Sequence, residues 1–261
     1  MIKENTLSVD AGYSSKTGIM DYRGVWTDSE KVYFYKKFYM SLEKNTGRIL
    51  GLDVSTKTIG IALFESDGKL LELTHITPKI KPKPETKLEE LFKKVDAFEL
   101  LLTRYIELDI EKVIIEEPLL NSNNVNTVAT LLRFNGMISK IVSEVLNIIP
   151  EFISSYDARK YSFPTLMGVR KFNKKGENYT EKEISKKKPV LFGNYDYTID
   201  KKMVIWEKVA DLEPQIVWEY DKNQKLKKEN FDMTDSYACV RAAMCREGIW
   251  DCSEKVKIKK S

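Results

Sequence analysis

Apolar residues are grouped along the chain in short β-branched runs and in longer segments with helical spacing. Residues 48–52, 58–65 and 70–76 are runs of strand length with turn residues such as SDGK between them, and they predict a three-stranded antiparallel meander. A linker rich in proline and lysine, PKIKPKPETK, follows. Between Leu88 and Ile106 apolar residues recur at steps of three and four, which predicts a helix.

The next part of the chain adds two more strands to this pattern. Residues 112–116 form a short, β-branched run that ends before Pro118, as a buried strand would. A helix over residues 125–145 and a strand over residues 151–155 follow, so the order is β-β-β-α-β-α-β. A right-handed crossover would place strand 112–116 parallel to strand 48–52 and beside it. We therefore expect an α/β fold with a mixed five-stranded sheet, three antiparallel strands followed by parallel strands, flanked by helices.

The remaining segments define the expected domain organisation. Residues 1–48 hold two aromatic-rich strand candidates, 18–26 and 31–39, and predict an N-terminal β-hairpin extension. The main domain is expected over residues 49–252, with helices at about 200–211 and 234–247. It carries a basic insertion at about 161–198, and a basic tail follows at 253–261.

Composition limits the chemistry that the chain can perform. The 261 residues can bury a sizeable core, and no apolar run approaches the roughly 18–20 residues that span a bilayer. With no secretory signal at the N-terminus, we expect a cytoplasmic protein, in the host cytoplasm if the source is a virus. The cysteines, Cys239, Cys245 and Cys252, are expected to be free thiols. His75 is the only histidine, which excludes His-rich zinc centres and catalytic triads that need histidine.

Four carboxylates lie at the ends of predicted elements. Asp53 ends the strand in RILGLDVSTKTIGIALFE, Glu116 ends the strand in KVIIEEPLL, and Asp232 and Asp235 open the last helix in DMTDSYACVRAAM. Side chains alternate along a strand, so Glu117 should face away from this group. Adjacent strands and one helix can bring the four acids together, where their repulsion calls for Mg²⁺ or Mn²⁺, with two ions per site. These residues predict metal-assisted phosphodiester hydrolysis. Simple roles remain open, with Asp53 as a turn former, Glu116 reaching solvent and Asp232 as a helix cap.

Basic and amide residues indicate a polyanionic partner. The net charge is only +4, but residues 159–188 contain ten Lys/Arg against three acids. A solvated lysine-rich loop is the alternative. The residues expected to contact nucleic acid are Arg159, Lys160, Arg170 and Lys171 in this segment, Asn121, Asn123 and Asn124 in the loop after Glu116, and Arg133 on the helix that follows.

The three acidic motifs resemble those of RuvC-type Holliday-junction resolvases of the ribonuclease H-like superfamily. LGLDVSTKTIGIALFE, VIIEEPL and DMTDSYACVRAAM correspond to the motifs that supply an Asp, a Glu and a D-x-x-D pair, and the resemblance covers most of residues 48–250. It implies a divergent, Mg²⁺-dependent homodimer that nicks opposed strands of a four-way DNA junction. It also implies that Lys201 and Lys202 support the metal site or bind phosphate. Residues 1–48 and the long basic stretch depart from the compact family pattern, as in viral and other divergent relatives.

Other functions fit parts of the pattern. The same acids could cut flaps, replication forks or RNA:DNA hybrids. GLDVSTKTIGIALFESDGK also resembles the first phosphate-binding loop of actin-like ATPases and sugar kinases, but the chain has only 12 glycines and no suitable Gly-Gly cluster. A catalytically inactive DNA-binding protein would have no need for all four acids.

Overall fold

The computed structural model describes residues 7–14, 19–26, 32–39, 47–118, 124–250 and 252. The chain divides into two compact units, residues 1–46 and 47–261. The first unit is an antiparallel sheet of β1 (Leu7–Ser14), β2 (Ile19–Trp26) and β3 (Val32–Tyr39), in that order. β2 and β3 pair as a hairpin, and β1 is a strand that the apolar pattern did not predict. The tail expected at 253–261 lies outside the described residues.

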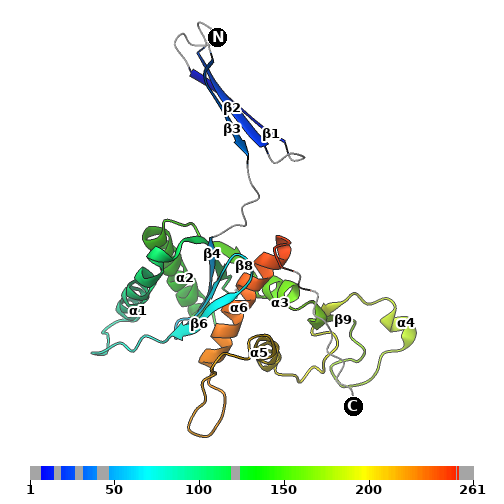
Figure 1. Cartoon of the computed structure of the whole chain (residues 1–261). Coiled ribbons are helices and arrows are strands. Elements are labelled where there is room, and N and C mark those ends of the chain that lie inside the picture. The colour runs from blue at the N-terminus through cyan, green and yellow to red at the C-terminus, as the bar shows by residue number, and fades with distance from the viewer. Residues whose placement is uncertain are drawn as a thin grey trace. The chain divides into compact units, whose positions relative to one another are not determined.

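The second unit is built on a mixed five-stranded sheet with the order β6-β5-β4-β7-β8 (Figure 1). β4, β5 and β6 are antiparallel, whereas β7 runs parallel to β4 and β8 runs parallel to β7. This confirms the expected mixed five-stranded sheet, including the strand neighbours β4 and β7. The strands are β4 (Arg48–Val54), β5 (Ile59–Phe64), β6 (Leu70–Ile76), β7 (Ile110–Glu116) and β8 (Glu151–Ile153).

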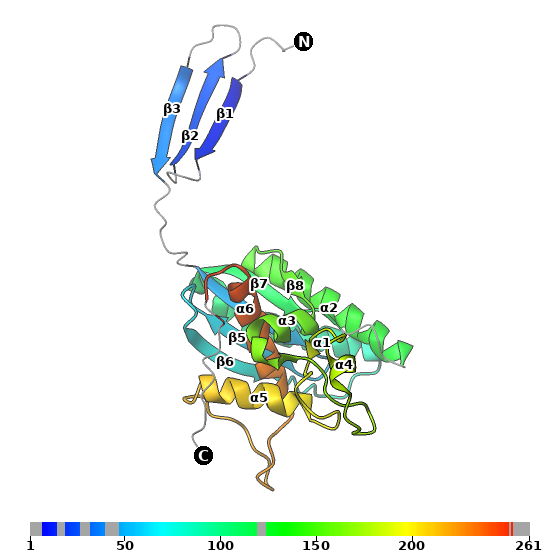
Figure 2. The same ribbon diagram turned by 90° about the vertical axis from the view of Figure 1, so that its right-hand side faces the viewer.

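Helices cover both faces of the sheet. On one face lie α1 and α2, and on the other lie α6, α3 and α5 (Figures 1 and 2). Two short 3₁₀ turns, η1 and η2, follow α1 and α3. The helical bounds are α1 (Lys87–Leu102), η1 (Thr103–Leu108), α2 (Val125–Leu146), α3 (Ser155–Ser162), η2 (Pro164–Leu166), α4 (Glu181–Ile184), α5 (Lys201–Leu212) and α6 (Glu229–Arg246).

The basic insertion has little regular structure of its own. It contains α4 and a two-stranded antiparallel sheet of β9 (Met167–Gly168) and β10 (Val190–Leu191). The guanidinium of Arg170 donates to the carbonyl of Tyr195 at 2.7 Å and lies 4.1 Å from the ring centroid of Tyr197. These contacts tie the start of the insertion to its end.

Side chains on β4 alternate between two hydrophobic cores. Leu50, Leu52 and Val54 belong to the core beneath α1 and α2, whereas Ile49 belongs to the core beneath α6. Asp53 is four residues after Ile49, and alternate side chains of a strand share a face, so Asp53 also faces α6. The apolar pattern that builds the strand therefore also decides which face receives the carboxylate.

α6 is enclosed by the rest of the unit, and it packs unusually close to the sheet. Thirteen of its eighteen residues are buried, among them Asp235 and Ser236. A Cβ on Gly51 would lie 2.5 Å from the carbonyl oxygen of Ser236, and a Cβ on Gly60 would lie 2.0 Å from that of Asp232. Both distances are far below van der Waals contact, so the two glycines set how near α6 can come. α6 itself presents small residues such as Ser236, Ala238 and Ala242, and the sheet contributes these two glycines.

Two expectations about the C-terminal part are wrong. The last helix begins at Glu229 rather than at about residue 234, so Asp232 and Asp235 lie inside its first two turns. Cys245 and Cys252 form a disulfide, whereas Cys239 is a free, buried thiol. Among the described residues, no helix is long and apolar enough to cross a membrane.

Substituting Gly60 by alanine tests the close packing of α6. The added methyl group would meet the backbone of Asp232, so we expect the free energy of unfolding to fall by about 1–3 kcal/mol or more. Urea denaturation measures this change. Gly136 in α2 is the matched control, because a Cβ there has no neighbour within 4 Å. Gly136→Ala should stabilise the protein by about 0.5–1 kcal/mol, because alanine favours helix. Equal effects of the two substitutions would contradict the packing account.

Candidate active site

Two carboxylates lie side by side at the carboxyl ends of β4 and β7. The parallel register pairs Leu52 with Ile115, which places Asp53 beside Glu116. Leu52 and Ile115 both belong to the core beneath α1 and α2, so the next residue of each strand faces α6. Glu117, the next residue along the chain, is exposed and lies on the other face of the sheet, as expected. The β4–β7 pairing therefore positions two acids on one face of the sheet.

α6 brings the other two carboxylates to the same face. Asp53 pairs across the β4–β5 ladder with Gly60, and Gly60 lies directly beneath the backbone of Asp232. Asp235 is one helical turn further along, and its side chain is only 5% exposed. Neither acid is the N-cap, because that position is Lys228, whose side chain makes no capping hydrogen bond. The helix-cap role considered for Asp232 is therefore excluded.

Two basic side chains contact this group of acids. A terminal guanidinium nitrogen of Arg159, on α3, donates to Oδ1 of Asp235 at 3.0 Å. Nζ of Lys202, at the start of α5, lies 3.6 Å from Oδ2 of Asp235 and 3.9 Å from Oδ1 of Asp232. The resemblance implies that Lys202 supports a metal site or binds phosphate, and the structure places its ammonium group beside two of the acids. Arg159 was grouped with the nucleic-acid contacts, but its largely buried side chain lies among the acids instead.

Burial and mutual repulsion raise the pKa values of three of these carboxyls. Burial is the main cause of the raised pKa of Asp53, and the charges of Glu116, Asp235 and Asp232 add to it. Burial, followed by the charge of Asp235, raises the pKa of Glu116 to about 8, although Arg159 opposes the change. The pKa of Asp232 rises to about 6 through burial, against the lowering effect of Lys202. The two basic residues therefore do not neutralise the cluster.

The cluster also contains polar atoms without partners. Within the described part of the chain, the buried Oε2 of Glu116 accepts no hydrogen bond, and the buried Nε of Arg159 donates none. A buried carboxylate oxygen without a partner is costly, and a hard divalent cation satisfies such an oxygen. The donor set of four carboxylates therefore fits Mg²⁺ or Mn²⁺.

The side chains do not already form a complete metal cage. Among the described residues, no three or more His, Cys, Asp or Glu side chains are arranged together as ligands of one ion. Arg159 and Lys202 lie against Asp235 and Asp232 instead. Metal binding would thus replace contacts with these two cations, at least in part.

The other residues expected to contact nucleic acid are spread over the surface. Asn121 and Asn123 lie outside the described residues. Asn124 caps α2 by accepting from the backbone N–H of Thr127, and it lines a pocket of about 400 Å³. Arg133 is exposed on α2. In and near the basic insertion, Lys171 is exposed, and Lys160 and Lys201 lie 4.8 and 5.8 Å from the ring centroids of Tyr161 and Phe192.

α3, the helix that carries Arg159, was not predicted from the sequence. Its N-cap is Ser154, whose side chain accepts from the backbone N–H of Asp157, and this Ser-x-x-Asp spacing is a helix-start signal. Ser162 then donates to the carbonyl of Ala238 at 2.6 Å, and Arg241 donates to the carbonyl of Ser162 at 2.9 Å. These bonds fix α3 against α6, and with it the Arg159 side chain against Asp235.

Comparisons with known proteins add structural likeness only. No family model matches the sequence, and no curated protein matches it. Among solved structures, Thermus thermophilus RuvC has a TM-score of 0.42 and 14% identity over 77% of this chain and 96% of its own. The structure of T. thermophilus RuvC in complex with a Holliday junction substrate has a TM-score of 0.44 and 10% identity. That match covers 78% of this chain and 97% of the RuvC chain. The yeast mitochondrial Holliday junction resolvase Ydc2 has a TM-score of 0.41 and 12% identity, and the match covers 78% of this chain and 80% of Ydc2. Likeness at this level says nothing of activity.

The raised pKa values predict that the metal-free protein loses stability as pH rises. Glu116 keeps its proton in the folded state up to about pH 8, whereas in the unfolded state it ionises near 4.5. The folded state therefore binds more protons across this window, and its stability must fall from about pH 4.5 to about pH 8. Urea denaturation in EDTA at a series of pH values measures the decline.

Glu116→Gln should flatten that decline, because glutamine cannot ionise. Glu117→Gln is the matched control, since the neighbouring side chain is exposed on the opposite face. The control should keep the wild-type slope. Identical slopes for Glu116→Gln and wild type would show that Glu116 is not in the environment described.

Proposed function

We propose that this protein is a divalent-metal-dependent endonuclease that hydrolyses phosphodiester bonds in branched DNA, with a four-way junction as its substrate. The observation that supports the chemistry most strongly is the convergence of four acids from β4, β7 and α6 on one face of the sheet. Their burial and repulsion disfavour the charged state, and a cluster of this kind is costly unless a cation binds it.

The proposed ligands of the metal are Asp53, Glu116, Asp232 and Asp235. They would hold two Mg²⁺ ions, or Mn²⁺ in their place, and the bound ions would supply an activated water and charge stabilisation at the phosphate. Glu116 offers its buried Oε2, which has no partner in the described part of the chain.

The neighbouring basic residues have separate roles in this proposal. Arg159 contacts Oδ1 of Asp235, and it holds that carboxylate in position from the side of α3. Lys202 is about half exposed, with 49% of its side chain accessible, so its ammonium group can also reach a phosphate oxygen. Lys202 therefore binds and orients the phosphate at the acids.

The substrate and the assembly are proposed from the resemblance of the three acidic motifs. A four-way junction presents two equivalent strands, and a homodimer with two-fold symmetry would place one active site at each. The basic insertion, with exposed lysines such as Lys171, would contact the DNA arms.

A cleavage assay on several DNA structures tests this function. Wild-type protein with Mg²⁺ should make paired, symmetric nicks in a mobile four-way junction, and it should leave linear duplex uncut. Preferred cutting of a flap, a fork or an RNA:DNA hybrid would support phosphodiester hydrolysis by these acids but contradict the four-way junction as the substrate. Equal cutting of linear duplex would contradict junction resolution.

Asp53→Asn tests the chemistry itself. The loss of one carboxylate ligand should lower the cleavage rate by at least about 100-fold while binding to the junction is retained. Glu117→Gln, on the opposite face, is the control and should cut at the wild-type rate. Normal turnover by Asp53→Asn would refute the proposed active site.

A further inference from the structure

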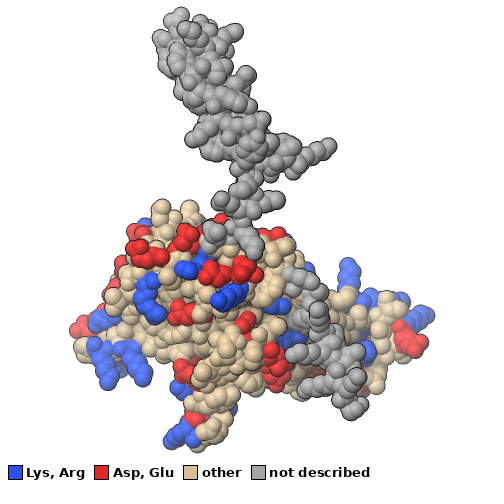
Figure 3. Space-filling model, in the orientation of Figure 1, with Lys and Arg blue, Asp and Glu red and all other residues tan. Residues whose placement is uncertain are grey.

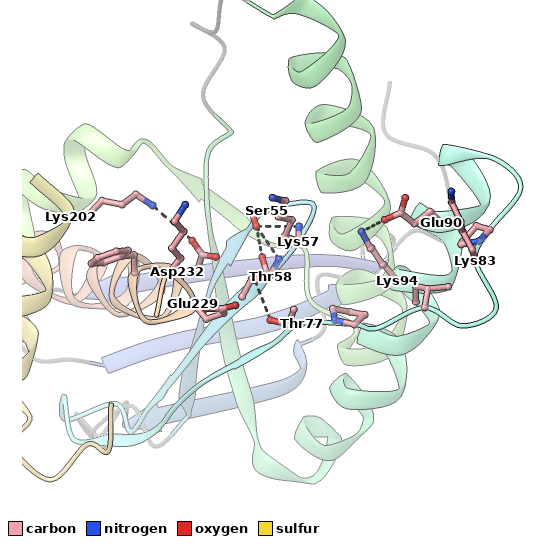
Figure 4. A pocket seen from close by; sticks show the side chains of 15 residues that line it. Ser55, Lys57, Thr58, Thr77, Lys83, Glu90, Lys94, Lys202, Glu229 and Asp232 are labelled. Atoms are coloured by element: carbon pink, nitrogen blue, oxygen red, sulfur yellow. Dashed lines mark hydrogen bonds and ion pairs between the residues drawn. The ribbon is translucent and has the colours of Figure 1, made fainter. Parts of the chain in front are cut away.

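A pocket of about 870 Å³ opens directly beside the acidic cluster, and lysines line it. Five parts of the chain form its wall: the β4–β5 turn, the loop before α1, α1 itself, the start of α5 and the start of α6. Asp232 and Lys202 lie at one end, and Lys83 lies at the other (Figure 4). We call this the lysine pocket. It shares two residues with the proposed active site, so the two are continuous.

Positive charge exceeds negative charge in the lysine pocket. Three acids line it, against five lysines: Lys57, Lys83, Lys94, Lys202 and Lys228. Two of the lysines are engaged, because Lys94 contacts Glu90 and Lys202 contacts Asp232 and Asp235. The other three, Lys57, Lys83 and Lys228, are exposed and have no ion-pair partner in the described part of the chain. Their ammonium groups are available to an anion.

The floor of the pocket is held by hydrogen bonds between side chains. Oγ1 of Thr58 lies 3.1 Å from Oγ1 of Thr77, which in turn lies 3.2 Å from Nδ1 of His75. Nε2 of His75 lies 3.1 Å from Glu219 in the loop before α6. This chain of contacts joins β5, β6 and the α5–α6 loop, so it fixes the pocket wall before any ligand binds.

The loop before α1 presents lysines on a stiff backbone. It is the PKIKPKPETK segment, in which Pro78, Pro82 and Pro84 restrict the backbone around Lys83. Restricting a loop lowers the entropy lost when its side chains bind a ligand. Lys and Arg gather on the surface over this loop, on the face drawn in Figure 3. The segment that looks like a mere linker in the sequence therefore carries a fixed group of positive charges.

We propose that the lysine pocket binds the sugar-phosphate backbone of one nucleic-acid strand on one side of the phosphodiester at the acidic cluster. This inference depends on the proposed nuclease function. Ammonium groups contact phosphate oxygens regardless of base, so the pocket positions the strand and does not read its sequence. Lys202 lies at the junction of the two sites, and Lys57, Lys228 and Lys83 contact successive phosphates further away.

The salt dependence of binding tests how many phosphates the pocket contacts. Binding of a four-way junction would be measured from low to high salt in an Asp53→Asn background, which prevents cutting. The triple variant Lys57→Ala, Lys83→Ala and Lys228→Ala should bind more weakly and lower the salt slope by roughly 2–3, because three phosphate contacts are lost. The matched control removes three exposed lysines outside the pocket, Lys69, Lys222 and Lys225, and should keep the wild-type slope.

Crosslinking tests where the strand lies. A photoreactive group attached to Lys83→Cys should react with nucleotides on one side only of the bond that the wild-type enzyme cuts. The same group on Lys69→Cys, at the β5–β6 turn, should give no crosslink at those nucleotides, and the unsubstituted protein corrects for labelling of native cysteines.

The outcomes separate this inference from the proposed function. If wild type cuts branched DNA but the triple variant keeps the wild-type slope, the pocket assignment fails and the nuclease function stands. If wild type cuts no nucleic acid but the triple variant lowers the salt slope and the control variant does not, the nuclease function fails and the binding site stands. Displacement of DNA from the pocket by ATP with Mg²⁺ at equal concentrations would overturn the assignment in favour of a nucleotide site.

Discussion

The close contact between α6 and the sheet is the constraint on which the site depends. Gly51 and Gly60 have no side chains, so the backbone of α6 lies directly on β4 and β5. If either position carried a larger residue, the helix would move outward and take Asp232 and Asp235 away from Asp53. The packing contact that buries α6 therefore also brings the four acids together.

That assembly has an electrostatic cost, which the protein offsets only in part. Arg159 and Lys202 approach Asp235 and Asp232, yet the pKa values of Asp53, Glu116 and Asp232 remain raised. A structural salt-bridge network would lower the pKa values of its acids, so the raised values distinguish this cluster from such a network. This contrast supports the proposal that the cluster binds external cations, beside a pocket that we propose binds phosphates.

Much of this arrangement could be predicted from the sequence, because its signals are local. Periodic apolar runs identified the strand order, and parity along each strand placed Asp53 and Glu116 on one face and Glu117 on the other. The role of Arg159 could not be predicted, because it pairs with a residue 76 positions away through a short helix. The close approach of α6 to Gly51 and Gly60 could not be predicted either, since no periodicity of the sequence shows which backbone will lie against a glycine. The three lysines of the pocket come together only when the loop, the turn and α6 are placed in space.

The central claim is that the four carboxylates form a site for divalent cations, and a direct titration of Mn²⁺ tests it most plainly. The free Mn²⁺ signal would be followed by electron paramagnetic resonance as protein is added, without DNA. Wild type should bind Mn²⁺, and the Asp53→Asn, Asp235→Asn double variant should bind none at the same concentrations. Equal binding by the two proteins, or none by wild type at millimolar Mn²⁺, would contradict the account.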